Sequence, residues 1–212
     1  MLVLHYTGMR SGEAAIDRLC DAEAKVSAHY VVEEHGGVVQ LVAESERAWH
    51  AGVSAWRGHS NINQRSVGIE IVNPGHDYGY RPFPQAQMVS VAELCLDILS
   101  RYTIPARNVV GHSDVAPARK QDPGELFDWA WMARQGIGLW PEDGLRIMDD
   151  KEALAPSSII HSLASYGYDT TDLPATIVAF QRHFRPKLLN GMWDTECAAL
   201  LHSLLDATHC LG

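Results

Sequence analysis

The chain has 212 residues, of which 46% are hydrophobic, and it carries a formal net charge of −9 at pH 7. That hydrophobic fraction allows a well-buried core and excludes a largely disordered chain. The acidic balance argues against a nucleic-acid partner, and no apolar run reaches the roughly 18 residues that a membrane-spanning helix needs. The length suits one domain of about 140–150 residues and a smaller second one.

Strand and helix patterns alternate along the first two thirds of the chain. We expect strands at residues 2–6, 67–72 and 108–112, a β-hairpin over 28–42, and helices at 12–24, 84–102 and 125–136. The hairpin follows from two β-branched runs joined by Gly36-Gly37, and the helix at 84–102 follows from apolar residues at helical spacing after Pro84. Segments 53–66 and 73–84 are expected to be loops. This alternation is typical of an α/β fold.

The pattern changes after residue 140. Residues 141–152 are polar and include Pro141 and Gly144, which indicates a linker. The remaining residues carry only helical patterns, in three runs. The sequence therefore predicts a domain at 1–140, a linker at 141–152 and a small three-helix domain at 153–212.

The four cysteines, at positions 20, 95, 197 and 210, form no CxxC pair and no zinc-finger spacing. Cys20 and Cys95 fall in helical apolar patterns, where a free thiol behaves as a small hydrophobe. We expect inert, unpaired thiols rather than a disulfide framework, which favours a reducing compartment. No signal-peptide pattern is visible, so a cytoplasmic location is favoured, and a truncated N-terminus would leave the periplasm or cell envelope open.

Three residues with metal-binding side chains stand next to apolar, strand-like runs or in the loop after one. His5 lies in LVLHYTG, His112 follows NVVG, and Asp122 precedes Pro123 in the loop beyond it. Two imidazoles and one carboxylate make an open catalytic zinc site, with a fourth position left for water. A histidine in such a place is more often a hydrogen-bonded structural residue, and His5 lies more than a hundred residues from His112. The residues alone leave both interpretations open.

Glu70 and Lys120 are the candidate catalytic groups. Glu70 interrupts the apolar run SVGIEIVN, and in a cleft its desolvation would raise its pKa towards the range of a general base. On a two-faced sheet it would instead point to water or pair with an arginine. Lys120 stands two residues before Asp122, so in an extended segment both would point the same way, and Lys120 could stabilise an oxyanion. A solvated loop lysine is the alternative.

Candidate substrate contacts are less specific. Between His50 and Pro82 three arginines stand against two acids, so Arg57 and Arg65 could hold a substrate carboxylate. Scattered surface arginines would give the same pattern. His29 and His50 stand near strands or loops and could help to shape the pocket.

The segments HYTG, SAHYVV, AWHAG, SVGIEIVNPG and GHSDVAPARKQDPG, in this order, resemble the type-2 N-acetylmuramoyl-L-alanine amidases of the AmpD and AmiD kind, relatives of T7 lysozyme and peptidoglycan recognition proteins. The resemblance covers roughly residues 1–140. It implies a mixed central sheet flanked by helices. It also implies hydrolysis of the amide between N-acetylmuramic acid and L-alanine in peptidoglycan or muropeptides, a reaction of bacterial cell-wall degradation and recycling.

Residue by residue, the resemblance implies Zn²⁺ held by His5, His112 and Asp122, with Glu70 as the catalytic glutamate and Lys120 as the lysine that assists it. The C-terminal unit resembles a peptidoglycan-binding three-helix module through ASYGYD, IVAFQRHFRP and NGMWDTE. Two alternatives remain. A non-catalytic peptidoglycan-binding protein on the same fold would be expected to lack a ligand or the glutamate, and another zinc hydrolase could cut within the stem peptide.

Overall fold

The structure is a computed structural model that describes residues 1–141 and 153–209. Its centre is a five-stranded sheet of order β3-β2-β6-β1-β7. The strands are β1 (Leu2–Tyr6), β2 (Tyr30–Val32), β3 (Val38–Gln40), β6 (Val67–Ile71) and β7 (Val109–Gly111). All neighbouring pairs are parallel except β2 with β3, which form the antiparallel hairpin. The sheet is therefore mixed, and the predicted α/β class is confirmed.

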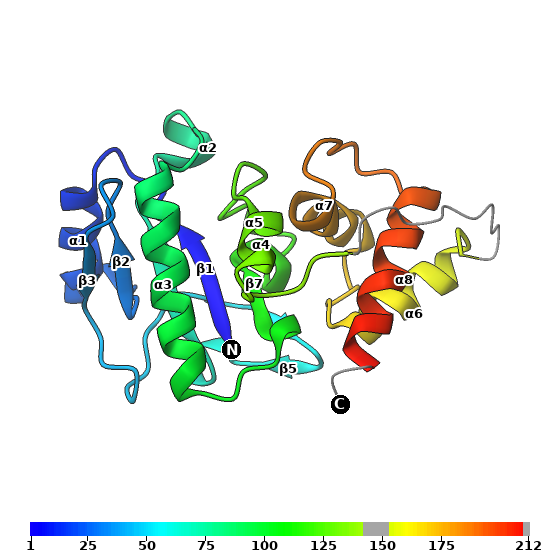
Figure 1. Ribbon diagram of the computed structural model, residues 1–212, viewed down its shortest axis with the longest axis horizontal. Helices are drawn as coiled ribbons and strands as arrows, with labels where there is room; N and C mark the ends of the chain where they lie inside the picture. Colours follow the sequence, from blue (N-terminus) through cyan, green and yellow to red (C-terminus); the bar gives the residue numbers. More distant parts are fainter. Residues whose placement is uncertain (142–152, 210–212) are drawn as a thin grey trace.

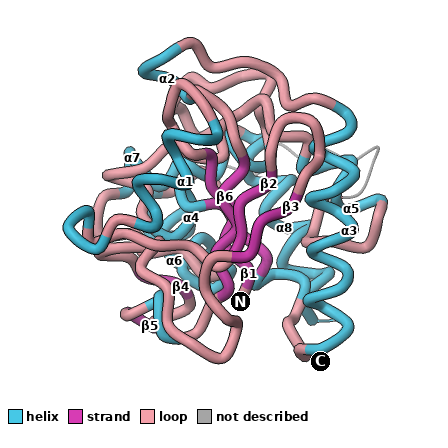
Figure 2. Tube along the Cα trace, turned by 90° about the vertical axis from the view of Figure 1, so that its left-hand side faces the viewer, coloured by secondary structure: helices cyan, strands magenta, loops and turns pink. Residues whose placement is uncertain are grey.

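Helices cover both faces of this sheet. Figure 2 shows the strands in the middle, with α3 on one side and α1 and α4 on the other. The α-helices are α1 (Gly12–Cys20), α2 (Gly75–Tyr78), α3 (Gln85–Arg101), α4 (His112–Val115), α5 (Trp129–Arg134), α6 (Pro156–Tyr166), α7 (Leu173–Phe184) and α8 (Thr195–His209). Short 3₁₀ turns lie at η1 (Ala22–Ala24), η2 (Ile62–Gln64) and η3 (Ala106–Asn108), and a two-stranded ribbon is formed by β4 (Ala55–Trp56) and β5 (His59–Ser60).

Three elements differ from the sequence-based expectation. The first helix ends at Cys20 because the backbone of Asp21 is extended, and the Asp21 carboxylate caps the next turn by accepting from the Glu23 amide. The helix expected at 125–136 begins only at Trp129, since Asp128 is its N-cap. The segment 53–66, expected to be a loop, contains the β4–β5 ribbon, whose strands are too short to show a period of two.

Two apolar clusters hold the sheet in place, one on each face. Leu2 and Leu4 of β1 point towards α3, together with Ile69 and Ile71 of β6. Val3, between the two leucines, belongs to the cluster on the opposite face. This follows from the period of two along a strand. The alternation places His5 on the face of Val3, away from α3.

The C-terminal helices α6, α7 and α8 pack against the sheet domain (Figure 1). Their buried residues, including Ile159, Leu163 and Phe180, join one apolar cluster with Val3 of β1 and Val110 of β7. The predicted linker at 141–152 lies outside the described residues except for Pro141. The division into domains stays a prediction, and the contact between the two parts includes this buried apolar cluster.

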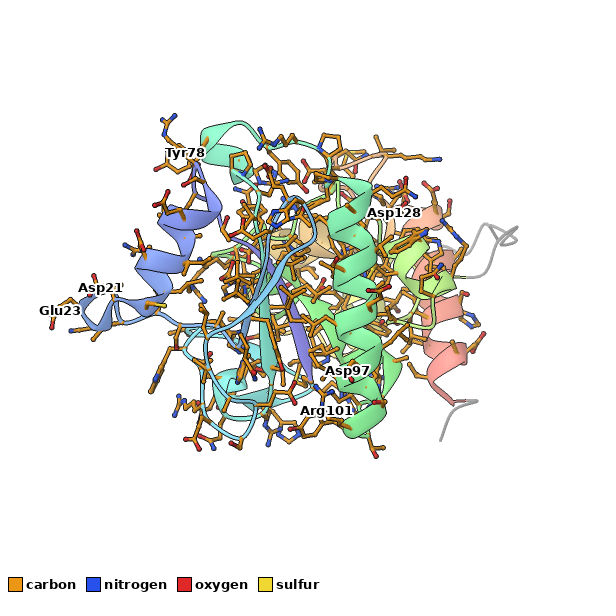
Figure 3. All side chains as sticks on the ribbon, turned by 60° about the vertical axis from the view of Figure 1, so that its left-hand side comes forward. Asp21, Glu23, Tyr78, Asp97, Arg101 and Asp128 are labelled. Carbon is orange, nitrogen blue, oxygen red and sulfur yellow. The ribbon has the colours of Figure 1, made fainter. Side chains whose placement is uncertain are left out.

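The C-terminal end of α3 is tied to the segment that follows β3. Figure 3 shows Asp97 and Arg101 together at this end of the helix, where they form an ion pair one turn apart. Arg101 also binds the carboxylate of Glu44, with 2.6 Å between Nη2 and Oε1. This exposed network fixes the loop after β3 against the helix and contributes little to stability.

Cys95 and Cys197 are buried free thiols, and burial raises the pKa of Cys95 to about 12 and that of Cys197 to about 11. Cys20 is also free, but it is exposed at the end of α1, so the expectation that it packs as a small hydrophobe was wrong. Cys210 lies outside the described residues. Among the helices in the described ranges, none is long and apolar enough to cross a membrane.

Candidate metal centre

Parallel pairing brings the candidate residues to one edge of the sheet. β1 and β6 are paired so that His5 lies beside Glu70. His112 is the first residue after β7, which runs parallel to β1 on its other side. Because the carboxyl ends of parallel strands meet at the same edge, residues from three distant segments gather there.

His5, His112 and Asp122 converge at this edge. The Nδ1 atoms of the two histidines are 2.9 Å apart, and each lies 3.0 Å from Oδ2 of Asp122. All three side chains are buried. A tetrahedral zinc ion with bonds of about 2.0–2.1 Å would space its ligand atoms about 3.3 Å apart, so the three atoms need move only a few tenths of an ångström to bind one.

The outer nitrogen of His112 fixes where its proton lies. Nε2 of His112 is 3.0 Å from the carbonyl oxygen of Ala51. A carbonyl only accepts, so Nε2 carries the proton and donates it. In the neutral ring, Nδ1 then carries no proton, and its lone pair points at Asp122.

A longer chain of hydrogen bonds fixes the proton of His5. The Ser66 hydroxyl donates to the carbonyl of Ile62 over 2.7 Å, so its oxygen accepts from Nε2 of His50 over 3.2 Å. Nδ1 of His50 is then an acceptor, and Nε2 of His5 donates to it over 3.0 Å. This assignment from the network leaves Nδ1 of His5 unprotonated as well. We call the series His5, His50 and Ser66 the histidine relay.

The three converging atoms are therefore all acceptors, and none has a proton to share. Burial, together with the neighbouring His112, lowers the pKa of His5 to about 4, so this ring stays neutral near pH 7. Three buried lone pairs facing one point are the donor set of a cation.

The segment that carries His50 is held close to the sheet. The side-chain oxygen of Asn63 accepts from the amides of His50 and Ala51, over 3.0 and 2.7 Å. A Cβ atom on Gly68 of β6 would lie 2.4 Å from Cγ of the His50 ring, so only glycine lets the ring lie against the strand. The sequence analysis missed Asn63 and Ser66, because neither belongs to a recognisable spacing pattern.

A cavity of about 380 Å³ is lined by two of the proposed ligands, His112 and Asp122, and by both candidate catalytic residues. Burial, and then the carboxylate of Asp122, raises the pKa of Glu70 well above its ordinary value, while Lys120 opposes this rise. Oε2 of Glu70 is buried without a hydrogen-bond partner among the described residues. Glu70 thus has an acceptor atom ready for a proton.

The four predicted substrate contacts lie in different places. His50 lines the cavity, but its ring nitrogens are used by the histidine relay. His29 does not line the cavity, and its ring bonds backbone groups of Gly68 and Glu46.

The two predicted arginines also lie away from this cavity. The amide of Arg57 donates to the carbonyl of Gly167 beyond α6, and Arg65 is exposed and lines a separate hollow beside Met1. The geometry does not support substrate contacts by Arg57 and Arg65 in the cavity. Arg18 and Arg119, which the sequence analysis did not single out, line it instead.

Residues 1–125 match the sequence profile of a family described as N-acetylmuramoyl-L-alanine amidase. Among curated proteins, the N-acetylmuramoyl-L-alanine amidase AmiD of Escherichia coli is 41% identical over 230 aligned positions, which cover 97% of this chain and 82% of AmiD.

Two solved structures match almost the whole chain. One is E. coli AmiD in complex with the substrate anhydro-N-acetylmuramic acid-L-Ala-D-gamma-Glu-L-Lys, with a TM-score of 0.87, 39% identity, and coverage of 98% of this chain and 88% of that one. The other is AmpDh3 of Pseudomonas aeruginosa, with a TM-score of 0.90, 35% identity, and coverage of 98% and 91%. The similarity therefore includes the C-terminal helices as well as the sheet domain.

Proposed function

The chain belongs to the N-acetylmuramoyl-L-alanine amidase family and is an enzyme of that class, and we propose that it hydrolyses its amide with the help of one zinc ion. The zinc would be held by Nδ1 of His5, Nδ1 of His112 and Oδ2 of Asp122. The observation that carries this proposal is the convergence of three buried acceptor atoms that have no proton between them. Two histidines and one carboxylate leave a fourth position open to water or substrate.

In the proposed reaction, the zinc ion and the cavity residues Glu70 and Lys120 have separate roles. A bound zinc ion supplies Lewis acidity and lowers the pKa of water towards neutrality. Glu70 takes a proton from the attacking water as it adds to the lactyl carbonyl carbon of the muramic acid. Lys120 stabilises the negative charge that develops on the carbonyl oxygen. When the carbon–nitrogen bond breaks, Glu70 passes its proton to the amino group of L-alanine.

We propose muropeptides that carry an N-acetylmuramoyl-L-alanine bond as the substrate class. The solved AmiD complex contains an anhydro-muramyl peptide, and the whole chain aligns with that structure. Incubation of a purified anhydro-muramyl tripeptide with the full chain, followed by mass spectrometry, tests this. Free sugar and an intact free peptide are expected, with no products after chelation and recovery on adding zinc. Cleavage within the stem peptide would point instead to a peptidase.

The pH profile offers a test of Lys120. The positive charge of Lys120 favours the ionised form of Glu70, so it lowers a pKa that burial raises. In Lys120→Met that opposition is lost, and the pKa of Glu70 moves further up. The base must be ionised to act, so the acid limb of kcat/KM should move to higher pH. A uniform loss of rate with an unmoved limb would leave Lys120 with the oxyanion role alone.

Ser66 offers a test of the histidine relay. Ser66→Ala removes the acceptor for Nε2 of His50, so the proton order that leaves Nδ1 of His5 free is no longer enforced. Loss of an outer hydrogen-bond partner weakens metal binding by about 10–100-fold. We expect a loss near the lower end of that range in chelator competition. Ser60→Ala, an exposed serine in β5, is the matched control and should bind zinc like the wild type.

We propose a cytoplasmic location, which the free thiols of Cys20, Cys95 and Cys197 support because a reducing compartment keeps thiols unpaired. Cell fractionation tests it, since amidase activity should then follow a cytoplasmic marker.

A further inference from the structure

Helix α7 of the C-terminal part lies beside α4 and α5, next to the segments that carry two proposed metal ligands (Figure 1). Its last turn places two neighbouring cationic or ionisable side chains, Arg182 and His183, in that contact. Both are buried, with exposed fractions of 7% and 4%. We call them the α7 contact pair.

His183 binds Asp114, which belongs to α4. Nδ1 of His183 donates to Oδ2 of Asp114 over 2.7 Å, and the hydroxyl of Tyr168 donates to Oδ1 over 2.7 Å. The amide of Gly111 supplies a third hydrogen bond to the same carboxylate, also over 2.7 Å. Asp114 is 1% exposed, so the C-terminal part provides two of the three donors for a fully buried carboxylate.

Asp114 binds the backbone directly beside His112. It lies two residues after His112 in a helix of only four residues, and it accepts from Gly111, the residue just before His112. Ser113 between them donates its amide to the carbonyl of Asp122 over 2.9 Å. His183 is therefore linked through Asp114 to the backbone segment that carries His112 and binds Asp122.

Arg182 contacts the segment that follows Asp122. Nε of Arg182 lies 3.4 Å from Oε2 of Glu125, three residues beyond Asp122, in an ion pair without a hydrogen bond. Oε1 of Glu125 is 3.2 Å from Nε2 of His76, whose Nδ1 is 2.9 Å from the hydroxyl of Tyr6. Tyr6 follows His5 and lines the cavity. This polar chain thus leads from α7 back to the cavity wall.

From these contacts we infer that His183 is a positioning residue for the metal centre, and that α7 holds the His112 and Asp122 segments at the spacing that one ion needs. The inference rests on the proposed zinc site. Apolar side chains would fill a buried contact as stably as a polar pair, but a hydrogen-bonded pair fixes orientation as well. Ligand atoms must be held to within about 0.5 Å for tight binding.

Two substitutions at His183 separate positioning from packing. His183→Leu fills part of the space but lacks the donor, and zinc affinity of the full chain should fall about tenfold in chelator competition. His183→Asn places its amide nitrogen where Nδ1 lies but gives up the ring stacking on Trp129 and Phe184. Nε2 of His183 has no hydrogen-bond partner in the described part of the chain, so asparagine loses no other polar contact. It should restore most of the affinity even though it packs worse.

Leu204→Ala is the stability control. Leu204 is fully buried in α8 and belongs to the apolar cluster that joins the C-terminal helices to Val3 and Val110. Its truncation should therefore lower Tm without changing zinc affinity. The inference is overturned if His183→Leu binds zinc like the wild type, or if Leu204→Ala loses as much affinity.

If His183→Leu does not fold, Tyr168→Phe tests the inference instead. This variant keeps the ring and removes only the donor to Asp114, so a loss of a few-fold supports the inference and wild-type affinity overturns it. Failure of the wild type itself to bind zinc would instead remove the proposed function.

Discussion

Glu70→Ala is expected to keep zinc bound and to lose about 10²–10⁴-fold in kcat, the usual contribution of a general base. The glutamate is paired in register with His5 but is not one of the three converging ligands. Its desolvated carboxylate has a raised pKa, and its Oε2 atom has no hydrogen-bond partner among the described residues. Removing it takes away the proton acceptor and leaves the metal-binding atoms in place. Steady-state rates on an anhydro-muramyl peptide, with zinc measured in the same samples, provide the check.

Two further variants sharpen this result. Glu70→Gln keeps the shape of the side chain but cannot take a proton, so it should be nearly as slow as alanine. Glu93→Ala removes an exposed glutamate from α3 and should leave both rate and zinc content unchanged. Turnover near the wild-type level in Glu70→Gln would exclude Glu70 as the base.

His112→Ala is expected to lose the metal. It removes one of three ligand atoms. Zinc affinity should therefore fall further than when only a hydrogen-bond partner of a ligand is removed, which weakens it by about 10–100-fold. Zinc at about 100 times its Kd stabilises a folded protein by ~2.7 kcal/mol, so the wild type should gain Tm on adding zinc. The variant should gain almost none. Metal analysis after dialysis and thermal unfolding with and without zinc measure both effects.

The metal-free variant carries a second, less intuitive expectation. In the wild type without metal, lone pairs on His5, His112 and Asp122 face one another across 2.9–3.0 Å. Truncation of His112 relieves part of this repulsion, so it should cost less stability than a buried side chain of its size otherwise does. His59→Ala, an exposed histidine in β5, serves as the control and should behave like the wild type with and without zinc. Equal zinc binding by His112→Ala would contradict the ligand assignment.

Local patterns predicted the framework of the site well. The apolar run at 67–72 marked Glu70 as a polar exception, and the structure places it beside His5. The apolar spacing after Pro84 predicted α3 to within one residue at each end. These features depend on residues close in the chain, where period and capping decide the outcome.

Contacts between distant segments were harder to predict. Nothing in the spacing of His5 and Asp122 shows that they meet, and only the resemblance of several motifs in order implied it. The histidine relay and the α7 contact pair left no pattern at all, because each depends on one side chain from a loop or helix meeting another far along the chain. Arg57 and Arg65 were singled out by local charge, but charge density along the chain does not say which way a loop faces.

The most direct measurement of the central claim is anomalous X-ray scattering at the zinc edge from crystals of the full chain grown with zinc. We expect one peak in the sheet domain, bonded at about 2.0–2.2 Å to Nδ1 of His5, Nδ1 of His112 and a carboxylate oxygen of Asp122. No peak at that position, or a zinc ion held by other residues, would contradict the account.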